Sequence, residues 1–187
     1  MAALERARIP ARATREPGGS PGGEAIRRLL LEGDGDRWDA LGEALLVVAA
    51  RSDHVARLIA PLLSKGIWVV SDRFADSTLA YQGYGKGLAL KDLATLHRIA
   101  LGSFAPDLTL ILDLPPEIGL ARASARASAD DRFERLDRVF HERLRQGFQQ
   151  IAAQNRARCV LIDGARDPQT VHRAVRDAVE GRLRVRL

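Results

Sequence analysis

The sequence predicts an α/β protein, with a doubly wound parallel sheet that carries helices on both faces. Three short apolar runs, at 67–71, 108–114 and 159–162, have the length and composition of buried strands. Segments with helical patterns of ten residues or more separate these runs. Strands that alternate with such helices are joined by crossover connections, and they therefore pair in parallel.

The composition fits one globular domain over residues 1–187. Hydrophobic residues make up 46% of the chain and charged residues 28%, which is ordinary for a folded protein. The sequence has no apolar run long enough to span a bilayer, and its start lacks the apolar core of a secretory signal. Cys159 is the single cysteine, so we expect no internal disulfide and a cytoplasmic location.

The basic charge does not by itself indicate a nucleic-acid-binding protein. The net charge is +5, but arginine is scattered over the whole chain and aromatic residues make up only 5%. The four histidines lack metal-ligand spacing, and each is expected at a helix surface or partly buried. No Gly-x-Ser-x-Gly motif indicates acyl transfer. An anionic substrate is the better expectation.

The first part of the chain predicts a short helix that ends near Ala7 and a short strand that begins after Pro10. A loop follows at 14–23, where prolines and glycines are dense enough to break regular structure and to let the backbone approach a ligand. A helix is expected from Glu24 to residue 32, and the longest helical pattern covers 39–64. The centre of that pattern is apolar on nearly every face, which predicts burial on several sides, including at a subunit interface.

The strand at 67–71 leads into Asp72 and Arg73, and a helix is expected after them. Further helices are predicted at 91–103, from 116, at about 134–154, and from Asp167-Pro168, which has the residues of a helix N-terminus. Gly181 is expected to end the last helix.

Asp72 and Arg73 follow a predicted strand directly, and ligands of open α/β sheets bind beyond the carboxyl ends of the strands. An aspartate there can hold a hydrated Mg²⁺, and an arginine can clamp a phosphate through its parallel N–H donors. Taken alone, the pair fits a solvated strand end equally well.

Motifs in the order found here resemble those of the thymidylate kinases, which transfer the γ-phosphate of ATP to dTMP. The resemblance runs from about residue 9 to the end of the chain, and its pieces are Thr14-Arg15-Glu16-Pro17-Gly18-Gly19, Ala49-Ala50-Arg51, Asp72-Arg73-Phe74, Ser77-Thr78 with Ala80-Tyr81-Gln82-Gly83, Pro106-Asp107-Leu108-Thr109, Asp113-Leu114 with Pro116-Glu117, and Asp131-Arg132-Phe133-Glu134. It implies a P-loop-kinase-like fold, a homodimer, and Mg²⁺ bound with ATP.

The resemblance also implies roles for individual residues. Asp72 would organise Mg²⁺, and the loop at 164–167 would contact adenine. The residues implied in catalysis are Asp72, Arg73, Arg122 and Arg126, the last two in a lid at about 122–132. The residues implied in substrate binding are Arg15, Glu16, Arg27, Val47, Arg51, Ser77, Thr78, Tyr81 and Gln82.

The sequence departs from the family pattern in three places. No Gly-x-x-x-x-Gly-Lys-Ser/Thr loop occurs in it, so we expect an N-terminally truncated sheet with a gap between the strands at 67–71 and 108–114, and weak or no activity from this chain. Val47 replaces an aromatic residue that would stack on thymine, and Phe74 replaces a tyrosine. A non-catalytic, degenerate kinase that binds nucleotides or proteins is the alternative.

Overall fold

Two pairs of parallel strands form the framework of the chain in the computed structural model, which describes residues 1–32, 37–125 and 136–187. The strands are β1 (Ala11–Arg15), β2 (Trp68–Asp72), β3 (Thr109–Asp113) and β4 (Cys159–Asp163). β1 pairs with β2, and β3 pairs with β4. The chain divides into two compact units, Met1–Phe104 and Ala105–Leu187, which are described separately. That they form one domain, with a gap in a shared sheet, stays a prediction.

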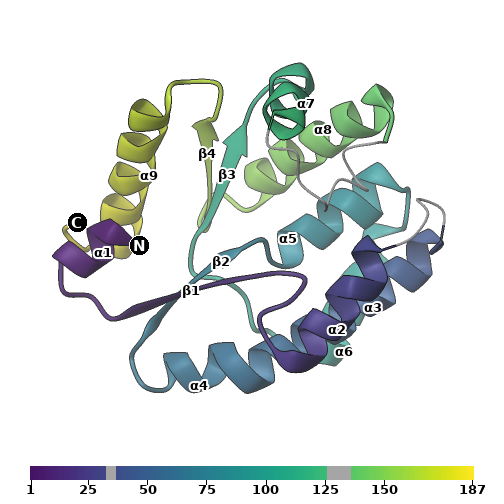
Figure 1. Ribbon diagram of the computed structural model, residues 1–187, viewed down its shortest axis with the longest axis horizontal. Helices are drawn as coiled ribbons and strands as arrows, with labels where there is room; N and C mark the ends of the chain where they lie inside the picture. The colour runs from purple at the N-terminus through teal and green to yellow at the C-terminus, as the bar shows by residue number, and fades with distance from the viewer. Residues whose placement is uncertain (33–36, 126–135) are drawn as a thin grey trace. The chain divides into compact units, whose positions relative to one another are not determined.

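The first unit surrounds β1 and β2 with helical segments. These are α1 (Ala2–Arg6), α2 (Pro21–Leu31), α3 (Ala40–His54), the π-helical η1 (Val55–Ile59), α4 (Ala60–Leu63), α5 (Ala75–Thr78), the π-helical η2 (Leu79–Gly85) and α6 (Leu90–Leu101). The helix α3 packs against α2 and α6, which lie beside it in Figure 1. Arg15 is in register with Asp72, so the carboxyl ends of both strands meet at one edge.

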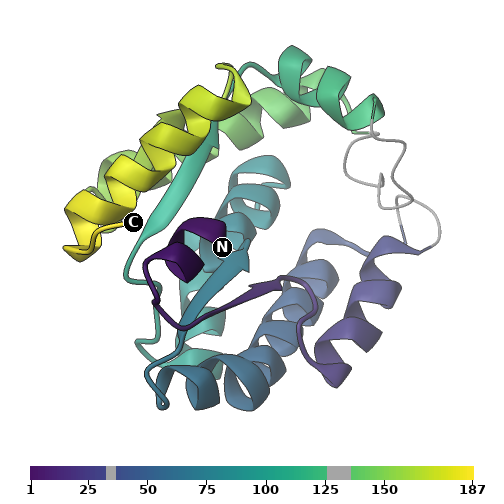
Figure 2. The ribbon, with the colours of Figure 1, turned by 60° about the vertical axis from the view of Figure 1, so that its left-hand side comes forward.

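The second unit places helices on either side of β3 and β4. Its helices are α7 (Pro116–Ser124), α8 (Arg138–Gln154) and α9 (Pro168–Leu183). Both α8 and α9 pack on the strands, and Figures 1 and 2 show them on opposite sides of the pair. Asp113 and Asp163 are partners at the carboxyl end of this sheet. The predicted α/β class, with parallel strands and helices on both faces, is confirmed.

Side-chain caps explain where the longer helices begin. Ser20, Asp39, Asp137 and Asp167 each accept a hydrogen bond from a backbone N–H of the following first turn. The Asp167-Pro168 helix start predicted from the sequence is confirmed. The Thr170 hydroxyl, followed by the Thr170 N–H, is the main reason why the pKa of Asp167 is lowered.

The structure differs from two local expectations. The helical run predicted at 39–64 contains the π turn η1. The sequence did not indicate this turn, because a π segment of a few residues has no periodic pattern of its own. Gly181 lies inside α9, which ends at Leu183 before Arg184 adopts a left-handed conformation at φ 55°. A single glycine costs a helix only about 1 kcal/mol, so it does not have to end one.

The strands are less buried than their apolar sequences predict. Val70 of β2, Leu112 of β3 and Leu161 of β4 are each between 44% and 49% exposed. Each strand has a single hydrogen-bonded neighbour, so part of its surface faces no other strand of the described residues. The buried core comes mainly from helices, through residues such as Ala44, Leu93, Phe140 and Ile151. None of the helices in the described ranges is both long and apolar enough to cross a membrane.

Candidate functional site

A buried ion pair joins the loop after β1 to α3. Glu16, which is 4% exposed, accepts a hydrogen bond of 2.6 Å from Nε of Arg51, which is 2% exposed. The same guanidinium donates through Nη2 to the Thr78 hydroxyl of α5 at 2.9 Å. Arg51 therefore connects three segments that the sequence singled out separately. A charge pair this deep is retained only when its remaining hydrogen-bonding groups are satisfied.

His54 extends this connection on the other side of Glu16. Its Nδ1 lies 3.1 Å from Glu16 Oε1, and its Nε2 lies 2.8 Å from the Thr14 hydroxyl. The residue is fully buried, so the expectation of a surface or partly buried histidine is wrong. The sequence held one signal: His54 follows Arg51 by three residues, which places both side chains on one face of a helix.

Arg73 and Tyr81 meet at the carboxyl end of β2. The guanidinium carbon of Arg73 lies 4.8 Å from the centroid of the Tyr81 ring, within the range of a cation–π contact. Arg73 also has a φ of 70°, a left-handed conformation that is uncommon for a residue with a side chain. Such strain clusters at functional sites, although Arg8 and Arg184 of this chain also have a positive φ. The structure thus brings together the arginine and the tyrosine that the resemblance assigns to phosphate and deoxyribose.

Asp72, the residue expected to organise Mg²⁺, lies exposed at the end of β2. Its backbone carbonyl is engaged, since it accepts from the Glu16 N–H at 2.9 Å. Across the described ranges, no group of three or more His, Cys, Asp or Glu side chains is arranged to hold a metal ion. Mg²⁺ in phosphate sites often takes one or two carboxylates and completes its shell with phosphate and water, so a single carboxylate is compatible with it.

Gln82 is directed to a buried carboxylate that the sequence analysis missed. Its Nε2 donates to Glu43 Oε1 at 2.6 Å, and Gln82 is 3% exposed. Lys86 forms an ion pair with the other oxygen of Glu43 at 2.9 Å. Glu43 itself is fully buried on α3. The amide expected to bind the base is therefore used to attach η2 to α3.

Two arginines lie next to the glycine-rich loop, Arg15 at the end of β1 and Arg27 on α2. Arg15 forms an exposed ion pair with Glu24 at 3.2 Å, and Arg27 donates to the carbonyl of Pro17 at 2.9 Å. The Gly19 N–H is the largest reason why the pKa of Glu24 is lowered, and Arg15 adds to the effect. Glu24 thus holds the loop from the first turn of α2, with Arg15 partly free to solvent.

Three further residues from the sequence patterns lie on or next to the helices that carry Arg51 and Thr78. Val47 is half-buried one helical turn before Arg51 on α3. The half-buried Ser77 caps the turn after β2 by donating its N–H to the Phe74 carbonyl at 2.9 Å. The guanidinium carbon of Arg51 lies 5.1 Å from the centroid of the Phe74 ring, which also packs edge-on against Phe104. Phe74 thus contributes to burying the ion pair.

Among the described residues of the second unit is Arg122, one of the two predicted lid arginines. Arg122 of α7 donates from Nη1 to the Gly164 carbonyl at 2.7 Å and from Nη2 to the Ala165 carbonyl at 3.3 Å. It therefore contacts the loop that the resemblance places against adenine. Arg126 and the Asp131-Arg132-Phe133-Glu134 motif lie outside the described residues, as does most of the predicted lid.

Asp113, at the end of β3, receives both arms of Arg145 and the amide of Gln149 from α8. The Arg145 bonds are 2.8 and 2.9 Å long, and they are the main reason why the pKa of Asp113 is lowered. A carboxyl whose pKa is lower in the folded state stabilises the fold above its unfolded pKa, about 3.9, and loses that contribution as the pH falls through the folded pKa.

We expect Asp113→Asn to lower the free energy of unfolding by about 1–2 kcal/mol between pH 6 and 8, because it removes charge-assisted hydrogen bonds. The difference from the unchanged protein should shrink below about pH 4. Urea unfolding at a series of pH values measures it. Asp163→Asn is the matched control, since its ion pair with Arg166 is exposed. A difference that stays constant down to pH 2 would contradict the assignment.

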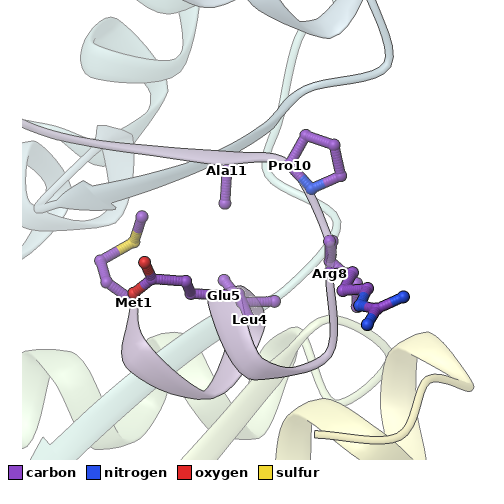
Figure 3. A pocket seen from close by; sticks show the side chains of 7 residues that line it. Met1, Leu4, Glu5, Arg8, Pro10 and Ala11 are labelled. Carbon is purple, nitrogen blue, oxygen red and sulfur yellow. The ribbon is translucent and has the colours of Figure 1, made fainter.

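A separate hollow of about 380 Å³ lies between α1 and the start of β1. Figure 3 shows the side chains around it, and they belong to Met1, Leu4, Glu5, Arg8, Ile9, Pro10 and Ala11. None of the residues predicted for catalysis or substrate binding is among them. The candidate site is instead the neighbourhood of Arg51 and of the carboxyl end of β2.

Comparisons with known proteins agree on one family. The family model described as thymidylate kinase matches residues 1–175. The thymidylate kinase of Caulobacter vibrioides is 52% identical over 170 residues, which are 91% of this chain and 81% of the relative. That of Bradyrhizobium diazoefficiens is 50% identical over 182 residues, 96% of this chain and 80% of the relative. The crystal structure of thymidylate kinase from Ehrlichia chaffeensis matches with a TM-score of 0.71 at 32% identity, covering 90% of this chain and 79% of that one.

Proposed function

Because the chain belongs to the thymidylate kinase family, we propose that its substrate is dTMP, that ATP is the phosphate donor, and that dTDP is the product. The observation that carries this proposal is the path from Glu16 through Arg51 to Thr78, which ties three motifs of the family into one buried structure. The single cysteine favours a cytoplasmic enzyme.

Phosphoryl transfer depends mainly on positioning and on stabilising negative charge, and arginines supply both. We assign Arg73 to the phosphate of dTMP, with Arg15 and Arg27 on the same side. Tyr81 lies against Arg73, so its ring packs beside the phosphate and against the deoxyribose.

Ser77 and Thr78 face the base together with Arg51, whose Nη1 we assign to substrate. Val47 supplies an apolar contact to the base. Glu16 acts indirectly, by holding Arg51.

Asp72 is the residue that would hold Mg²⁺ at the end of β2. When bound, the ion neutralises charge on the phosphates of ATP. Arg122 fixes the loop at Gly164 and Ala165, which supports a role in shaping the adenine side of the site. We assign Arg126 to the ATP phosphates on the family pattern alone. Gln82 is a structural partner of Glu43 more than a ligand of the base.

The sequence contains no Gly-x-x-x-x-Gly-Lys-Ser/Thr loop, so the backbone cradle and lysine that hold ATP phosphates are absent from it. We therefore propose that the 187-residue chain binds dTMP but transfers phosphate far more slowly than ordinary kinases, whose turnover is about 1–100 per second.

Calorimetry and a coupled assay test the two halves of this proposal separately. We expect dTMP to bind in the absence of ATP, and ADP release to stay near the background rate when both nucleotides are present. Arg51→Met, which removes the central guanidinium, is the control for specific binding. ADP release at ordinary kinase rates would contradict the second half. A folded chain that fails to bind dTMP would contradict the first.

We also propose that the chain forms a homodimer through α3. Leu41 and Leu45 are 50% and 48% exposed, and with Ala49 they form a stripe at four-residue spacing on one face of that helix. Leu45→Asp should give a monomer or an aggregate by light scattering, because a buried carboxylate opposes association. Val139→Asp, at a 58% exposed valine of α8, is the matched control and should leave the size unchanged. An unchanged size for Leu45→Asp would contradict the interface.

A further inference from the structure

His54 is a fully buried titratable side chain on α3, one turn from Arg51. The proposed function gives it no role. It is held on both nitrogens, by Glu16 on one side and by Thr14 on the other. Five side chains thus form one interior path, in the order Thr14, His54, Glu16, Arg51 and Thr78. The path crosses from β1 and its following loop to α3 and on to α5.

The partners of His54 indicate which of its ring nitrogens donates and which accepts. Glu16 forms an ion pair with Arg51, a permanent cation, and in that pair it is a carboxylate. A carboxylate only accepts, so Nδ1 of His54 carries the proton that points at Oε1. In the neutral ring Nε2 then accepts from the Thr14 hydroxyl. Each oxygen of Glu16 therefore has its own donor, His54 on Oε1 and Arg51 on Oε2.

The loop backbone restricts the ring further. A Cβ placed on Gly19 would lie 2.3 Å from His54 Nε2 and 2.6 Å from the Thr14 hydroxyl. Gly19 has a φ of +80°, so glycine both permits the loop conformation and leaves room for the ring. The imidazole is enclosed between α3 and the loop, and it has little freedom to release Glu16.

We infer that His54 is a positioning residue for the dTMP site: by donating from Nδ1 to Glu16, it fixes the carboxylate that in turn aims the guanidinium of Arg51. The inference rests on the proposed function for the identity of the ligand. It assigns His54 no contact with the substrate. Its contribution is to keep Glu16 from rotating, since a carboxylate with Arg51 alone could turn about its side-chain torsions and take the guanidinium with it.

Two substitutions separate this role from mere packing, because an asparagine amide reaches the place of Nδ1 and a glutamine amide reaches the place of Nε2. His54→Asn keeps the donor to Glu16 and loses the contact to Thr14. His54→Gln does the reverse. We expect the dissociation constant for dTMP, measured by calorimetry, to stay within about threefold in His54→Asn and to rise about tenfold in His54→Gln. A purely structural histidine would give equal losses that follow the melting temperatures of the two variants.

A second readout does not need dTMP. The Arg51 Nε–H signal in a ¹H–¹⁵N spectrum, assigned by its loss in Arg51→Lys, should exchange slowly in the unchanged protein and in His54→Asn, and rapidly in His54→Gln. Thr14→Val removes the contact to Nε2 of His54 and retains the contact between His54 and Glu16. It should therefore leave both the Arg51 signal and dTMP affinity unchanged. It is the variant to measure if His54→Gln fails to fold. Equal behaviour of the two histidine variants, or a tenfold affinity loss in Thr14→Val, overturns the inference. Failure of the unchanged protein to bind dTMP overturns the proposed function instead, and the exchange of the Arg51 signal then decides the role of His54.

Discussion

Arg51→Met should lower the free energy of unfolding by about 3–5 kcal/mol, the range found when one partner of a buried ion pair is removed. Methionine fills most of the vacated space but supplies no donor, so Glu16 stays buried with His54 as its remaining partner. Thr78 also loses the donor to its hydroxyl. Binding of dTMP should be lost with the guanidinium.

Urea unfolding followed by circular dichroism measures this effect, and calorimetry at a temperature where the variant is still folded measures binding. Arg57→Met is the matched control, because its ion pair with Asp53 is on the surface and its side chain is 68% exposed. Exposed pairs contribute little, so we expect a change of at most about 0.5 kcal/mol and unchanged dTMP affinity. Equal effects of the two substitutions would contradict the buried network.

Arg73→Asn should reduce dTMP affinity by about a hundredfold and leave stability unchanged or slightly higher. The affinity loss follows from removing a charge-assisted phosphate contact, which is worth about 3 kcal/mol at most. The stability result follows from the backbone: Arg73 has a φ of 70°, and asparagine adopts that conformation at lower cost than arginine. A residue that serves binding thus loses affinity without losing stability, whereas a residue that serves the fold loses stability.

Arg8→Asn separates the two effects. Arg8 also has a positive φ, 56°, but it lies beside the hollow at α1 and outside the candidate site. It should show the same response in stability without any loss of affinity. Calorimetry with dTMP and thermal unfolding of all three proteins check the prediction. A clear loss of stability in Arg73→Asn with unchanged affinity would mean that Arg73 serves the fold.

Local signals were enough to predict most of the elements. Apolar runs gave β2, β3 and β4 to within a residue or two, and Asp167-Pro168 gave the start of α9. The π-helical segments were missed, because they differ from α-helices by hydrogen-bond partners and leave no pattern in a few residues. The end of α9 was missed because glycine only weakens a helix.

The site was predictable in part. The Arg-Glu-Pro-Gly-Gly loop and the segment after β2 identified the family and the arginines, and the matches to other thymidylate kinases bear out the family. His54, Glu43 and Lys86 were missed because nothing in a sequence marks which distant charge a buried group will meet. Glu43 and Gln82 are 39 residues apart, and Glu16 and Arg51 are 35.

The sequence by itself determined the α/β class, the order of the elements and the family, since periodicity, caps and short motifs act over a few neighbouring residues. Only the tertiary structure decided which motif residues face one another. It assigned Gln82 to Glu43, Arg122 to the loop at Gly164, and Arg51 to Glu16. The physical reason is that burying a polar group is costly unless a partner is in place, and the partner is supplied by whichever segment folds against it.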